Sequence, residues 1–162
     1  MKRYPLQTLL RLREHRTDAA RMALFEQQRI VQACRDACIV IEAEIVALQF
    51  ERGQQRRRLL DAPPANVSWP TALAQREAHI DWLGLQVQGA QERLREAQQV
   101  LREAEQALAV ARAAYLRAKS RQDALEKRKE FWRGEQHAIE IRNEEAVTSD
   151  FLMSRHATGK TH

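Results

Sequence analysis

The chain has 162 residues and a net charge of +5, and Ala, Glu, Lys, Leu and Arg together account for 85 of its residues. A chain made up to about half of these five residue types is typical of coiled coils and long helices. Five glycines and four prolines are too few for a fold with many turns between strands. The composition therefore disfavours Rossmann folds, barrels and most enzyme architectures.

The first 60 residues predict one long helix, over about residues 5–60. Mostly apolar positions recur at alternating spacings of three and four residues, and ten of these 15 positions are apolar. They are Leu10, Arg13, Thr17, Ala20, Leu24, Gln27, Val31, Cys34, Cys38, Ile41, Ile45, Leu48, Arg52, Gln55 and Leu59. The polar members lie towards both ends of the stripe, so we expect its middle to pack best.

A cluster of helix-breaking residues follows, from Asp61 to Pro70. Its three prolines lack a backbone donor and also push the preceding residue out of the α region. Ser68 is a plausible N-cap for the next helix. We expect a turn over residues 61–70.

The second predicted helix, over about residues 70–148, carries the strongest signal in the chain. Twelve positions at the same spacing are all apolar, which indicates a coiled-coil seam with a large row and a small row. They are Ile80, Leu83, Val87, Ala90, Leu94, Ala97, Leu101, Ala104, Leu108, Ala111, Tyr115 and Ala118. We expect residues 151–162 to be a disordered tail.

Two long helices around a short turn predict an all-α fold, a long antiparallel two-helix coiled-coil hairpin that forms one domain over residues 1–150. If the turn centres near residue 65, residue i faces about residue 131 − i. The second helix then extends about 20 residues past the first. We expect a monomer, although a dimer of parallel helices is an alternative.

We find no catalytic, cofactor or metal motif. Cys34 and Cys38 are four residues apart but lie in the seam, and a structural zinc ion needs about four ligands. Gly159-Lys160-Thr161 lacks the glycine spacing of a phosphate-binding loop. The start of the chain lacks the apolar stretch of a signal peptide, and no apolar run is long enough for a membrane span. We therefore expect a cytoplasmic protein that is not an enzyme.

Two sets of residues are candidates for partner binding. One is in the overhang, where large apolar groups and acids lie on helix without a partner: Phe131, Trp132, Ile139, Glu140, Glu144 and Glu145. The other is beside the turn: Arg56, Arg57, Arg58 and Trp69. Each set also has a purely structural interpretation. Tyr4, Leu6 and Leu9 could cover the overhang. Beside the turn, Trp69 could pack against the turn, and the arginines could simply form a solvated helix surface.

The opening residues Tyr4 to Arg13, the helical hairpin, and the run Glu130-Phe131-Trp132 followed by Glu135, Glu140, Glu144 and Glu145 resemble the FliJ/YscO family. These are central-stalk proteins of type III secretion, in flagella and injectisomes. The resemblance implies a stalk in the pore of a hexameric export ATPase, which it stimulates. It also implies contact with the export-gate ring at the cytoplasmic face of the inner membrane, and with export chaperones.

Three alternatives to an injectisome stalk remain open: a flagellar stalk or chaperone escort, a generic coiled-coil scaffold, and a rod that associates with nucleic acid. Mixed charges and the acidic stretch over residues 135–150 argue against nucleic acid as a partner. No direct insertion into a membrane is expected.

Overall fold

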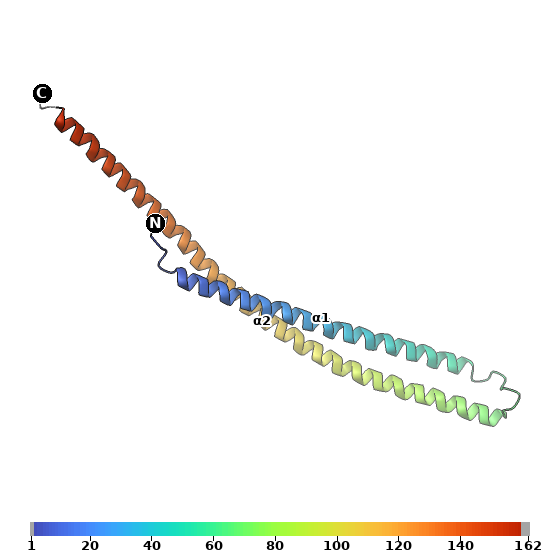
Figure 1. Ribbon diagram of the computed structural model, residues 1–162. Coiled ribbons are helices and arrows are strands. Elements are labelled where there is room, and N and C mark those ends of the chain that lie inside the picture. Colours follow the sequence, from blue (N-terminus) through green and yellow to red (C-terminus); the bar gives the residue numbers. More distant parts are fainter. Residues whose placement is uncertain (1, 160–162) are drawn as a thin grey trace. The chain divides into compact units, whose positions relative to one another are not determined.

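The protein consists of two long helices, as the composition predicted. A computed structural model describes residues 2–159 and contains α1 (Gln7–Arg57) and α2 (Trp69–Thr158), with no strand in that range (Figure 1). The helices pack against each other as a hairpin, which confirms the predicted fold class. Both predicted helices are present, and the connection between them spans residues 58–68.

The chain divides into two compact units, and each contains a stretch of both helices. One unit comprises residues 23–112 and includes the turn. The other comprises the residues up to Met22 together with those from Ala113 onwards.

The predicted seams form the contact between the helices. Every one of the 15 seam positions of α1 and the 12 of α2 is buried or half-buried. Ala90, in the row of small residues of α2, is fully buried, and Leu83, in the row of large residues, is 1% exposed. The small row therefore lets α1 approach closely, and the large row fills the space beside it. Burial of this apolar seam is the main favourable term for the hairpin.

Two polar seam members of α1 keep hydrogen bonds, whereas the buried Nε of Arg52 has no hydrogen-bond partner within residues 2–159. The Thr17 hydroxyl is buried and donates to the carbonyl oxygen of Arg13 at 2.9 Å. Gln27 Nε2 donates to the carbonyl oxygen of Ala104 on α2 at 3.1 Å. A buried polar group that keeps a hydrogen bond costs far less than one that loses it.

Cross-helix pairs fix the register of the hairpin. The Arg93 guanidinium donates to both carboxylate oxygens of Glu44, at 2.7 and 3.0 Å. This bidentate bond lowers the pKa of Glu44 and raises that of Arg93. Arg35 pairs with Glu105 at 3.3 Å in the same unit. The residue numbers of these two pairs sum to 137 and 140, whereas those of Gln27 and Ala104 sum to 131 and those of Glu51 and His79 to 130, so the predicted sum of 131 lies at the lower end of the observed range.

Arg76 connects the end of α1 to α2. It donates from Nη1 to the carbonyl oxygens of Arg58, Leu59 and Asp61, at 3.3, 2.9 and 2.7 Å. The end of α1 is therefore held beside the second turn of α2, where the predicted register also places it. Ser68 lies at the predicted N-cap position, and its carbonyl accepts the first helical bond, from the amide of Ala72.

The end of α2 differs from the expectation. The sequence predicted helix to about residue 148 and a disordered tail over 151–162, whereas α2 continues to Thr158. Residues that favour turns are accommodated because their hydroxyls bond carbonyls one turn earlier, Thr148 to Glu144 at 2.8 Å and Ser154 to Phe151 at 2.9 Å. Residues 160–162, which include Lys160 and Thr161, lie outside the described residues.

Candidate protein-interaction surfaces

The last five turns of α2 have no helix packed against them. Every residue from Ile141 to Gly159 is exposed, whereas seam positions continue half-buried as far as Gln136. We call residues 141–158 the tip segment. The predicted overhang is therefore present, but it begins further along the chain than expected because the first residues of the chain also pack on α2.

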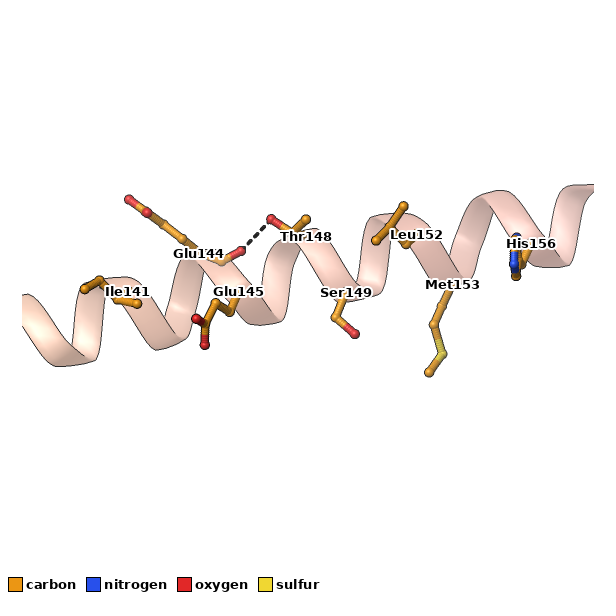
Figure 2. Close-up of a pocket in the computed structure, with 8 residues that line it drawn as sticks. All are labelled: Ile141, Glu144, Glu145, Thr148, Ser149, Leu152, Met153 and His156. Atoms are coloured by element: carbon orange, nitrogen blue, oxygen red, sulfur yellow. Dashed lines mark hydrogen bonds between the residues drawn. The ribbon is translucent and has the colours of Figure 1, made fainter.

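The tip segment has a face on which exposed apolar and acidic side chains lie side by side. Figure 2 shows the face, along which side chains recur every three or four residues. It consists of Ile141, Glu144, Glu145, Thr148, Ser149, Leu152, Met153 and His156. These groups line an open surface of one helix rather than a cavity. Large apolar side chains on an unpaired helix mark a site for another protein surface.

Phe131 and Ile139 extend this candidate surface back along α2. Phe131 is 70% exposed, and Ile139 is 43% exposed. Both border a second shallow depression, together with Gly134 and Ala138. Small residues at these positions leave room for a partner helix to approach closely.

Trp132 does not share the surface of Phe131, although the sequence placed the two together. Its ring packs against that of Tyr4 with centroids 5.5 Å apart and an interplanar angle of 54°. Tyr4 is buried, so the alternative in which the first residues cap the overhang holds for Trp132. Leu9 remains exposed, so the same alternative does not hold for Leu9. Glu140 also turns away from the tip face and borders the cleft beside Tyr4.

The predicted residues beside the turn lie in the other unit. Trp69 is the first residue of α2 and is 48% exposed, so the residue is accessible to a partner. Arg56 and Arg57 are in the last turn of α1, where cations favourably oppose the helix dipole. Arg58 follows directly and is exposed as well. All three arginines are free of ion pairs within residues 2–159.

The cysteines have the surroundings predicted from the seam. Cys38 is buried, Cys34 is half-buried, and both are free thiols. Within residues 2–159 no three His, Cys, Asp or Glu side chains are close enough to hold a metal ion. Over the same residues, no helix combines the length and the apolar character that crossing a membrane requires.

Sequence reasoning missed two groups of residues. Leu152 and Met153 were assigned to the disordered tail, and their spacing from Ile141 would have revealed a helical face. Five basic side chains, from the first residues of the chain and from α2, also come together in one cleft: Lys2, Arg3, Arg11, Lys129 and Arg133. The predicted register already placed Lys2 opposite Lys129, so this cluster could have been found.

Comparisons with known proteins give one relevant similarity. The structure is similar to that of CT670 from Chlamydia trachomatis, described as a proposed homolog of YscO, with a TM-score of 0.73 and 21% sequence identity. The match covers 99% of this chain and 98% of the other. No family model and no curated protein matches the sequence. At this identity the similarity shows that the fold is YscO-like.

Proposed function

We propose that the protein is a central stalk component of a type III secretion apparatus. In this role it binds a hexameric export ATPase, stimulates its turnover, and links it to the export-gate ring at the inner membrane. Export chaperones are further partners. The single observation that carries the proposal is the full-length likeness of the hairpin to the structure of a proposed YscO homolog.

The distribution of exposed groups supports this role. A stalk needs a slender end that a ring of subunits can surround, and the tip segment is a single helix with every side chain exposed. Ile141 and Leu152 lie on the same face of that helix, with Glu144 and Glu145 between them (Figure 2). Acidic groups beside apolar anchors suit a partner collar that presents basic and apolar groups. We therefore assign the tip to the ATPase, and Trp69 with Arg56, Arg57 and Arg58 to the export gate.

The test is binding of tip variants to the purified secretion ATPase from the organism that encodes the chain. Ile141→Ala combined with Leu152→Ala should weaken binding by about thirty-fold, which corresponds to about 2 kcal/mol for removing apolar anchors. The matched control is Val110→Ala with Leu116→Ala, because both side chains are exposed on α2 outside the tip.

A third variant, Trp69→Ala, tests the assignment of the two ends. It should bind the ATPase normally and lose affinity for the cytoplasmic domain of the export-gate protein. Loss of ATPase binding in Trp69→Ala, with normal binding of the tip variant, would reverse the assignment.

A further inference from the structure

A cleft lies between the first residues of the chain and α2, close to the beginning of the tip. Its volume is about 600 Å³, within the range typical of ligand sites. One wall is formed by residues 2–11 and the other by residues 129–140. Both walls belong to the same compact unit.

The cleft is strongly basic. Five cationic side chains line it, two from the segment before α1, one from α1 and two from α2, and Glu140 is the only acid among its lining residues. The cations are Lys2, Arg3, Arg11, Lys129 and Arg133. All five are free of ion pairs within residues 2–159, so the cleft has an excess of positive charge that Glu140 offsets only in part.

The backbone adds to this positive potential. α1 begins at Gln7 with no acidic residue in its first turn, and Leu6 before it has no side-chain acceptor for capping. Gln7 and Thr8 both line the cleft. The positive end of the α1 dipole is thus directed towards the same space.

The cleft is held in place by an aromatic contact. Tyr4 packs on Trp132, and this contact fixes the segment that carries Lys2 and Arg3 against α2. The Tyr4 hydroxyl is buried and lacks a hydrogen-bond partner within the described residues. A buried polar group without a partner in a native fold calls for a ligand or a rearrangement that supplies one.

We propose that this cleft binds a short acidic segment of another protein. Lys129 and Arg133 are one helical turn apart, and Gln7 and Gln136 lie among the cations. Cations spread over this length, with amide groups between them, match several carboxylates along an extended peptide. A single phosphate group would match cations that converge on one point, whereas these five come from the segment before α1, from α1 and from two turns of α2.

Acids around the cleft limit the length of the ligand. Glu140 lines the cleft, and Glu144 follows it one helical turn later at the start of the tip. A long polyanion such as a nucleic acid would meet these carboxylates as soon as it left the cleft, whereas a short acidic peptide would not. This proposal is independent of the identity of the partner that carries the segment.

The test uses the full chain and fluorescein-labelled hexaglutamate as the probe, with fluorescence anisotropy at low salt as the readout. Arg11→Ala combined with Arg133→Ala should weaken binding about tenfold, because two exposed charge pairs with the probe are lost. The matched control is Arg117→Ala with Arg121→Ala, which removes the same charge from exposed positions outside the cleft. Circular dichroism checks that all variants remain helical.

A variant that keeps the net charge tests whether binding depends on the shape of the cleft. Tyr4→Ala removes no charge but releases the segment that carries Lys2 and Arg3, so it should also weaken hexaglutamate binding.

Three results would overturn the proposal. They are equal losses in the two arginine pairs, tighter binding of inorganic pyrophosphate or of a single-stranded oligonucleotide than of hexaglutamate, and absence of hexaglutamate binding at low salt. Binding of hexaglutamate by a chain that does not bind the secretion ATPase would refute the proposed function and leave this proposal intact.

Discussion

Replacing Leu83 with alanine tests whether the seam holds the hairpin together. Leu83 is 1% exposed and is the largest apolar side chain that is fully buried. The substitution removes three carbon atoms, each worth about 0.8 kcal/mol of transfer free energy, which gives about 2.4 kcal/mol. A cavity adds to this cost, but a seam between two helices is open at its sides and can relax. We expect a loss of about 2–3 kcal/mol in the free energy of unfolding.

The control is Leu85→Ala, because Leu85 is two residues away on the same helix and is 64% exposed. It should change the free energy of unfolding by less than about 0.5 kcal/mol. Both variants are measured by urea denaturation, with the helical circular dichroism signal as the probe. Equal losses in the two variants would show that Leu83 is not in the contact between the helices, and would refute the seam.

The remaining predictions concern the small row, a glycine, the turn and one ion pair. Ala90→Leu should destabilise by about 1–3 kcal/mol through overpacking, while the exposed Ala107→Leu should be neutral in thermal unfolding. Gly89→Ala should stabilise by about 0.5–1 kcal/mol in the same assay, because a methyl group there meets nothing within 4 Å. Arg76→Met should lose the bonds to three carbonyls because it has no donor, and subtilisin should then cleave residues 58–68 faster; an unchanged cleavage rate would contradict this role. Because the pKa of Glu44 is lowered in the folded state, its ion pair stabilises the fold above the unfolded-state pKa, and this stabilisation is lost as pH falls through the folded-state pKa. Glu44→Gln should therefore reduce the decrease in the free energy of unfolding, measured by urea denaturation, that acidification causes in the wild type.

The sequence predicts the hairpin well because the period of its apolar residues is a direct consequence of helix geometry. A spacing of three and four residues leaves little freedom in which face of each helix is buried. Thr17 fits in the seam because its hydroxyl bonds a carbonyl one turn earlier, and Gln27 fits because it bonds a carbonyl of α2. The contacts that hold the turn are harder to predict. They are the bonds from Arg76 to the turn carbonyls, which connect residues 15 to 18 positions apart and have no periodic signal.

The candidate surfaces were predicted less well, for two physical reasons. Thr148 and Ser154 read as turn-forming residues, but inside a helix their hydroxyls can bond the preceding turn, so α2 continues past them. Adjacent residues on a helix point about 100° apart, which is why Phe131 and Trp132 belong to different surfaces. The exposure of Phe131 and the contact between Tyr4 and Trp132 needed the packed structure.

The most direct test of the account is the turnover of the purified secretion ATPase, measured as the protein is titrated in. The account predicts that the wild-type chain raises the rate of ATP hydrolysis to a plateau and has no hydrolytic activity when assayed alone. The variant with Ile141→Ala and Leu152→Ala should need about thirty-fold more protein to reach the same plateau. An ATPase rate that stays unchanged at saturating concentrations of the wild-type chain, with no binding of the two proteins, would contradict the proposed stalk function.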